Sequence, residues 1–205
     1  VSLKVLVDPE LIAAHPDWID YTQRTVSRAS QVYREQFGIA VELWSVGRWP
    51  VAGAGLDADG LLADVKSRSR EGADVLVGFT NRPLDGSIAG KGETPAENDP
   101  FNGGFAVVYA VEGRENPHLR TLLHELGHVF GAQDVTDVSH PDFKAGSWMS
   151  YAPVSAGQAP WPWSWLVAIG RLFRRGQGGQ GSGSQELEAK KQEATQHATD
   201  TLAKD

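Results

Sequence analysis

The run HELGHVFGAQD at residues 124–134 constrains this chain more than any other feature. If the run forms a helix, His124 and His128 stand one turn apart on the same face, so both imidazoles reach one tetrahedral metal ion at roughly 2.0–2.1 Å. Gly131 then breaks the helix, and Asp134 turns back toward the ion as an oxygen ligand. Three protein ligands leave a fourth position open for water. This pattern is typical of a catalytic zinc site rather than of a closed structural one.

Glu125 lies beside the two histidines in this run. A carboxylate at that position contacts the metal's water ligand rather than the metal, which suits it to take a proton as the water attacks a carbonyl. Short motifs of this kind also occur by chance on surface helices. Here the helix carries an apolar stripe opposite the histidines, so one face is predicted to pack and the other to bind metal. The stripe consists of Leu119, Leu122, Leu123, Leu126 and Phe130.

Two other residues compete for the place of the third ligand. His140 would need a loop of eleven residues after His128, and it directly precedes a proline. Asp137 is interpreted as a loop carboxylate or as one that contacts the ligand side chains without binding the metal itself. The remaining histidines have no partner at metal-ligand spacing and are predicted to face solvent or to cap helices. These are His15, His118 and His197.

The segment SWMSY at residues 147–151 contains the single methionine of the chain. Together with the first run it resembles the metzincin superfamily of zinc peptidases, whose signature is HExxHxxGxx followed by His or Asp, then a tight turn with a methionine beneath the metal. The resemblance implies that Met149 forms the hydrophobic floor of the site. Tyr151 stands where the astacin and serralysin branches place a tyrosine that ligates zinc or steadies the tetrahedral intermediate. The alternatives are core packing for Met149 and a buried, locally hydrogen-bonded aromatic for Tyr151.

The proposed third ligand departs from the commonest metzincin pattern, because Asp134 stands where most members carry a histidine. Snapalysin-like bacterial enzymes use aspartate at this place, so the site need not be inactive. The resemblance covers about residues 1–155 in the order of elements, which reprolysin-like domains share, but only residues 124–151 in specific motifs. It implies an α/β (α+β) fold: a metzincin-like catalytic domain with a twisted, mixed five-stranded sheet, an antiparallel edge strand, an active-site helix and a Met-turn.

Hydrophobic periodicity predicts the elements that precede the active-site helix. Strands are predicted at residues 2–7, 39–46, 74–79 and 105–111, and helices at residues 18–37 and 57–70. Gly38 is predicted to end the first helix and Asp57 to cap the second. Residues 87–90 are predicted to form a short edge strand. By the metzincin resemblance this strand borders the cleft and pairs with an extended peptide substrate.

The sequence changes character after residue 160. A segment from Trp161 to Arg175 combines three tryptophans with an apolar stretch that is too short to span a bilayer, which needs about 20 residues. The resemblance favours a helix packed behind the active-site helix, and an interfacial membrane anchor is the alternative. We predict a catalytic domain at residues 1–175, a flexible Gly/Ser/Gln linker at 176–184 and a polar helical or disordered tail at 185–205.

Composition limits the possible partners, cross-links and metal sites of this chain. The formal net charge of −7 argues against a nucleic-acid partner, and the absence of cysteine excludes disulfides and thiolate metal sites. Residues 91–104 offer oxygen ligands for Ca²⁺, but their spacing matches no defined calcium loop, and solvated loops share this composition. The chain begins with valine, which fits a processed product. We expect a secreted or extracytoplasmic location.

We therefore predict a zinc-dependent endopeptidase that hydrolyses peptide or protein substrates and carries one catalytic Zn²⁺. His124, His128 and Asp134 would hold the ion, while Glu125 would move a proton from water to the leaving amine and Tyr151 would support the oxyanion. Two alternatives belong to other classes. One is a zinc-containing peptide-binding module with an occluded or inactive site, and the other is a membrane-associated adaptor that uses the tryptophan-rich segment.

Overall fold

The computed structural model describes residues 1–51, 55–83, 86, 88–96, 99–111, 115–140, 143 and 147–150. Their elements follow one another as β1 (Ser2–Val7), α1 (Pro9–Ala14), α2 (Trp18–Phe37), β2 (Glu42–Arg48), α3 (Ala58–Lys66), β3 (Val75–Thr80), β4 (Gly90–Gly92), β5 (Gly104–Tyr109) and α4 (Leu119–Val129). None of the helices in this part of the chain is long and apolar enough to cross a bilayer.

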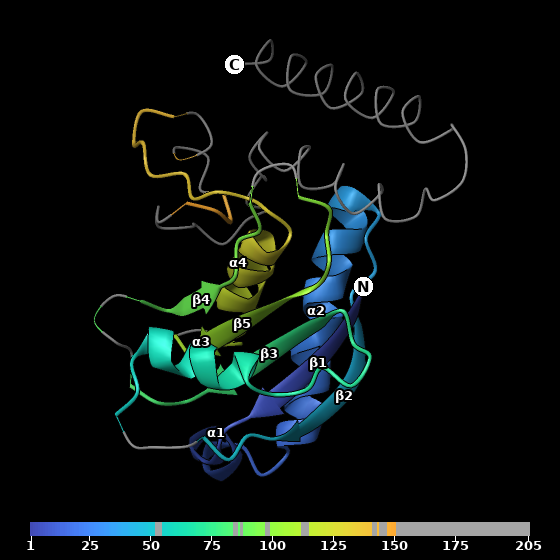
Figure 1. Ribbon diagram of the computed structural model, residues 1–205, viewed down its shortest axis with the longest axis vertical. Helices are drawn as coiled ribbons and strands as arrows, with labels where there is room; N and C mark the ends of the chain where they lie inside the picture. The colour runs from blue at the N-terminus through green and yellow to red at the C-terminus, as the bar shows by residue number, and fades with distance from the viewer. Residues whose placement is uncertain are drawn as a thin grey trace.

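The five strands form one mixed sheet in the order β2-β1-β3-β5-β4. β1 pairs in parallel with β2 and with β3, and β3 pairs in parallel with β5. β4 is the short edge strand and runs antiparallel to β5 (Figure 1). The predicted five-stranded mixed sheet with an antiparallel edge strand is therefore confirmed, as is the α/β fold class.

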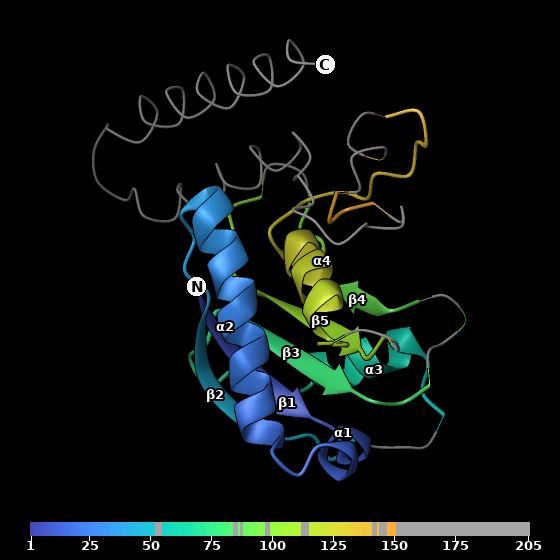
Figure 2. The ribbon, with the colours of Figure 1, turned by 180° about the vertical axis from the view of Figure 1, so that it is seen from behind.

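Helices cover both faces of the sheet. α2 and α4 lie on one face (Figure 2), and α3 lies on the other (Figure 1). Alternate side chains of each strand point to opposite faces, so β1 sends Leu3 and Val5 into the core under α2 and α4, and Leu6 into the core under α3. The result is a three-layer arrangement with a separate core on each side of the sheet.

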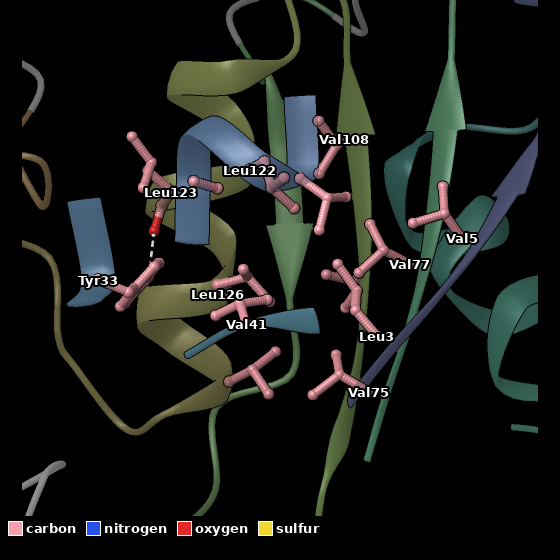
Figure 3. Packing of buried hydrophobic residues seen from close by; sticks show 14 of the residues in the cluster. Leu3, Val5, Tyr33, Val41, Val75, Val77, Val108, Leu122, Leu123 and Leu126 are labelled. Atoms are coloured by element: carbon pink, nitrogen blue, oxygen red, sulfur yellow. Dashed lines mark hydrogen bonds between the residues drawn. The ribbon is translucent and has the colours of Figure 1, made fainter. Parts of the chain in front are cut away.

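The larger core fixes the position of α4. Its apolar stripe packs on the sheet and on α2, and these side chains are at most 1% exposed: Leu122, Leu123, Leu126 and Phe130. From α2, the hydroxyl of the fully buried Tyr33 donates a hydrogen bond of 2.8 Å to the backbone oxygen of Leu123 (Figure 3). The amphipathic helix predicted from the sequence is present, and its apolar face is inside the protein.

Most predicted elements are confirmed, with shifts of a few residues at their ends. α2 ends at Gly38, whose φ of +68° is the left-handed conformation that favours glycine. Asp57 caps α3 by accepting a hydrogen bond of 2.7 Å from the Gly60 amide. α3 is shorter than predicted and ends at Lys66 rather than at residue 70. β2 starts at Glu42 rather than at residue 39, because its partner strand β1 begins only at Ser2.

One helix was not predicted. Asp8 and Pro9 follow the strand predicted at residues 2–7, and they begin α1. The carboxylate of Asp8 accepts a hydrogen bond of 2.8 Å from the Leu11 amide, and proline suits the first turn of a helix because it has no amide hydrogen to satisfy. The helix is only six residues long, which leaves too little sequence for a helical period to be visible.

The prediction for His118 was wrong. This residue stands at the N-cap position of α4, but its side chain makes no cap hydrogen bond and is fully buried. Its Nδ1 lies 2.7 Å from the Tyr21 hydroxyl and its Nε2 lies 3.1 Å from the Thr80 oxygen, while the ring stacks on Phe79. Partners from two other elements, α2 and β3, satisfy the two ring nitrogens, and spacing along the chain cannot reveal them. His197 lies outside the described residues.

Candidate metal centre

The proposed metal ligands lie on α4 and on the loop that follows it. His124 and His128 project from the side of α4 opposite its apolar stripe, and their side chains are 15% and 13% exposed. After the helix, Gly131 has a φ of +92°, a left-handed conformation that reverses the chain as predicted. The reversal brings Asp134 back to the two imidazoles. Three groups that lie within eleven residues of the sequence therefore meet at one point.

The three ligand atoms are spaced like the corners of a tetrahedron around a small metal ion. Nε2 of His124 and Nε2 of His128 are 3.1 Å apart. Oδ1 of Asp134 lies 3.2 Å from the first nitrogen and 3.4 Å from the second. Ligands at roughly 2.0–2.1 Å from a tetrahedral zinc ion would be roughly 3.3–3.4 Å from one another. The residues present therefore fit a zinc ion in both chemistry and spacing.

Backbone carbonyls fix the tautomer of each histidine. Nδ1 of His124 lies 2.8 Å from the Trp148 oxygen, and Nδ1 of His128 lies 3.0 Å from the Ala132 oxygen. A carbonyl oxygen only accepts hydrogen bonds, so both Nδ1 atoms carry their hydrogen, and in the neutral rings both Nε2 atoms present lone pairs. Two lone pairs facing each other repel unless a cation lies between them. This orientation is the one that metal-ligating histidines adopt.

Protons and metal compete for this cluster. Burial alone would raise the pKa of Asp134, but hydrogen bonds with His124 and His128 outweigh it and hold that pKa well below its usual value. Burial alone would lower the pKa of His128, but the hydrogen bond with Asp134 and the charges of Glu125 and Asp134 raise it. A raised histidine pKa means that metal must displace a proton, so metal affinity falls as the pH falls.

Glu125 is buried beside the ligands. The residue is 3% exposed. Burial raises the pKa of its carboxyl group to about 6, although the charges of His124 and His128 and the amide of Gly92 lower that pKa. Its Oε2 atom has no hydrogen-bond partner among the described residues. A buried carboxylate oxygen without a partner is costly, and such an atom is commonly completed by water or a ligand.

The chain from residue 147 to residue 150 forms a tight turn that supports the site. The Ser150 amide donates to the Ser147 oxygen over 3.0 Å, and the Val135 amide donates to the Met149 oxygen over 2.8 Å. The second bond fixes the residue next to Asp134, while Trp148 in the same turn holds His124. Met149 is fully buried and belongs to the core under α4. Its predicted role as a floor beneath the metal stays a prediction.

The rival ligands are not part of the cluster. In the described residues, the one group of three or more His, Cys, Asp or Glu side chains with ligand atoms within 4.8 Å of one another is His124, His128 and Asp134. The carboxylate of Asp137 accepts hydrogen bonds from the amide and the hydroxyl of Ser139. The His140 amide donates to the backbone oxygen of Asp137. The geometry favours Asp134 as the third ligand.

Several other predicted features have different outcomes. The edge strand was predicted at residues 87–90; it begins three residues later and ends two residues later, at Gly90–Gly92. Glu93, one of the residues considered for calcium, pairs instead with Lys66 at 2.7 Å. Tyr151, the tryptophan-rich segment, the linker and the tail lie outside the described residues. Their predicted roles remain predictions.

The comparison with known families agrees with this geometry. The family model of metallo-peptidase family M12 matches residues 1–161, which is most of the chain. The chain belongs to metallo-peptidase family M12. The metzincin-type prediction is thereby confirmed, and this M12 peptidase is a zinc-dependent hydrolase that acts on peptides or proteins. A search of curated proteins found no match.

Sequence reasoning missed two kinds of residue at the site of this M12 peptidase. The carbonyls of Trp148 and Ala132 orient the histidines, but any residue type provides a carbonyl, so no letter of the sequence marks them. Gly90 and Gly92 lie against Glu125. Their alternation along a strand was visible in the sequence, but only the structure shows that both face the active-site helix.

Proposed function

We propose that this protein is an endopeptidase in which Glu125 acts as general base and His124, His128 and Asp134 hold the zinc ion. The proposal rests chiefly on one observation: the unpartnered Oε2 atom of Glu125 lies in the same buried region as three ligand atoms with zinc spacing. A buried carboxylate with a pKa of about 6 is suited both to accept and to return a proton near neutral pH.

The zinc ion and the residues around it have separate roles in the proposed hydrolysis. A bound zinc ion supplies Lewis acidity, which makes a coordinated water more acidic and polarises the scissile carbonyl. Oε2 of Glu125 accepts the proton of the attacking water. The same oxygen then gives the proton to the leaving amine, so the carboxylate ends the cycle ionised, as it began. The hydrogen bonds from His124 and His128 to backbone carbonyls keep both rings in place throughout.

The edge strand β4 provides a place for an extended substrate. Residues on either side of Gly90 and Gly92 bond to β5: the Tyr109 amide donates to Ala89, and the Glu93 amide donates to Phe105. In an antiparallel ladder Gly90 and Gly92, which alternate with the bonded residues, direct their backbone groups away from β5, and the Gly92 amide also contacts Glu125. We propose that a peptide adds to this edge as a further strand beside the metal centre. Two further roles belong to the proposal: Met149 forms the hydrophobic floor beneath the metal, and Tyr151 supports the oxyanion.

A screen of peptide cleavage by mass spectrometry tests the proposed function. Zinc-loaded parent protein and a Glu125→Ala variant are incubated with a peptide library, and the zinc content of both is measured. We expect internal cleavage by the parent, and a turnover lower by roughly 10²–10⁴-fold in the variant at equal zinc content, because the general base is lost. Equal turnover in the two proteins would exclude Glu125 as the base, and release of terminal residues alone would exclude an endopeptidase.

A further inference from the structure

The two faces of β4 have opposite characters. Lys91 of β4 pairs with Asp59, and Glu93, the residue after the strand, pairs with Lys66, so both charged side chains lie toward α3. Because side chains alternate along a strand, Gly90 and Gly92 belong to the other face, against α4. The strand thus lies between two helices, with charged side chains toward one and no side chains toward the other.

The bare face is in direct contact with the catalytic helix. A methyl group added to Gly90 would lie 2.5 Å from Oε1 of Glu125, 2.7 Å from its Cγ and 2.6 Å from Cγ2 of Thr121. A methyl group added to Gly92 would lie 2.6 Å from the backbone oxygen of Glu125 and 3.0 Å from Cβ of His128. All but the last of these distances are shorter than side-chain contacts allow, and the last is unusually tight. A side chain at either position would displace either Glu125 or the strand.

Backbone conformation does not account for these glycines. Neither Gly90 nor Gly92 has a positive φ, unlike Gly38 and Gly131, so other residues are able to adopt the same backbone angles. The close approach to α4 is therefore the physical reason for glycine at both positions. The side chain that lies against this bare face is that of Glu125, whose carboxylate the Gly92 amide also contacts.

We propose that Gly90 and Gly92 are positioning residues of the active site: their missing side chains let β4 hold the Glu125 carboxylate against α4, beside the ligand atoms. The inference rests on the proposed role of Glu125 as general base. Misplacing a reacting group by about 1 Å is enough to reduce a rate by about 10²-fold. Contact with the strand backbone is suited to prevent this, because a strand in a sheet moves less than a side chain.

Gly90→Ala is the direct test, because the three closest atoms around Gly90 belong to side chains rather than to the backbone. We expect the variant to fold, with kcat reduced by roughly 10–100-fold and KM within about threefold of the parent, measured on the peptide that the parent cleaves fastest. Zinc affinity, measured by competition with a chelator, should also stay within about threefold, because the methyl group lies against Glu125 and Thr121 rather than the ligand nitrogens.

Gly47→Ala is the matched control. Gly47 lies in β2, the opposite edge strand, where an added methyl group would make an ordinary contact of 3.5 Å with Leu6. The control should keep the kcat of the parent. Thr121→Ser combined with Gly90→Ala removes one of the close atoms, and we expect part of the lost kcat to return, which a general loss of stability would not produce.

The possible outcomes separate this inference from the proposed function. A parent that cleaves no peptide contradicts the proposed function itself. An active parent with an unchanged kcat in Gly90→Ala overturns the positioning role and leaves the peptidase intact. A variant that loses kcat and zinc affinity together, or fails to fold both alone and with Thr121→Ser, also overturns it, because the glycine would then serve the structure rather than the placement of Glu125.

Discussion

Three histidines of one helix show how the surroundings of a residue decide its role. His118, His124 and His128 belong to α4 or to its N-cap. Both ring nitrogens of His118 bond to groups of the protein, whereas in His124 and His128 one nitrogen bonds to a carbonyl and the other points to a shared centre. Spacing in the sequence separated His124 and His128, which lie together with Asp134 in the structure, from the third histidine. It could not show that the third is buried.

The burial of His118 predicts how stability depends on pH. Burial lowers its pKa to about 4, against an unfolded value of 6.5, and the bond to Thr80 only partly opposes this. Between these values the unfolded chain binds more protons than the folded one, so stability falls as the pH falls from 6.5 toward 4, by about 3 kcal/mol in total. Urea unfolding of metal-free protein at pH 7.5 and near pH 4.5 measures the change.

A His118→Gln variant isolates this contribution. Glu125 has a raised pKa and acts in the opposite direction over part of the same range, so the useful quantity is the difference between parent and variant. The variant should lose less stability than the parent over the same interval of pH. Equal losses in both proteins would mean that His118 binds protons equally in the folded and unfolded chain.

At the scale of elements, one hydrogen bond joins α2 to the metal-binding helix. The hydroxyl of Tyr33 reaches the backbone of Leu123, next to His124, and its ring packs edge to face on Phe130 at 5.4 Å. The site of this peptidase is therefore placed by a helix that is held from two sides: the sheet contacts its apolar stripe, and α2 contacts its backbone.

Tyr33→Phe measures the contribution of that bond. The ring and its packing remain, and only the hydroxyl is lost, so we expect a loss of about 1 kcal/mol in the free energy of unfolding. Zinc affinity should stay unchanged, because the ligands are positioned by other bonds. Urea unfolding and chelator competition provide the two values. An unaltered free energy of unfolding would show that the bond contributes nothing, and a large fall in zinc affinity would show that it orders the site.

The helices and strands differ in how well they could be predicted from the sequence. α2 and α4 were predicted because long amphipathic segments show a helical period, and a glycine with left-handed φ ends the first of them. α1 was missed because six residues show no period. β4 was placed two to three residues too early, because a strand of three residues with two glycines has no apolar alternation to fix its position. Its register is set by β5 instead, through contacts that lie far apart in the sequence.

At the scale of the whole molecule, the sheet and its helices bring together parts of the chain that are distant in sequence. The edge strand β4, the helix α4 and the turn at residues 147–150 meet at the metal centre, although more than fifty residues separate the first from the last. The cluster of His124, His128 and Asp134 could be predicted because it is local, with three residues within eleven positions. The groups that orient Glu125 and His124 could not, because they belong to the tertiary structure.

The central claim is that His124, His128 and Asp134 form the zinc site, and zinc affinity tests it most directly. Competition with a chelator at pH 7.5 gives the dissociation constant of the parent, of Asp134→Ala and of His140→Ala, the rival ligand. We predict a loss of at least roughly 100-fold for Asp134→Ala, more than the loss expected for a residue that only supports a ligand. We predict no change for His140→Ala. Unchanged affinity in Asp134→Ala, with a loss in His140→Ala, would contradict the account.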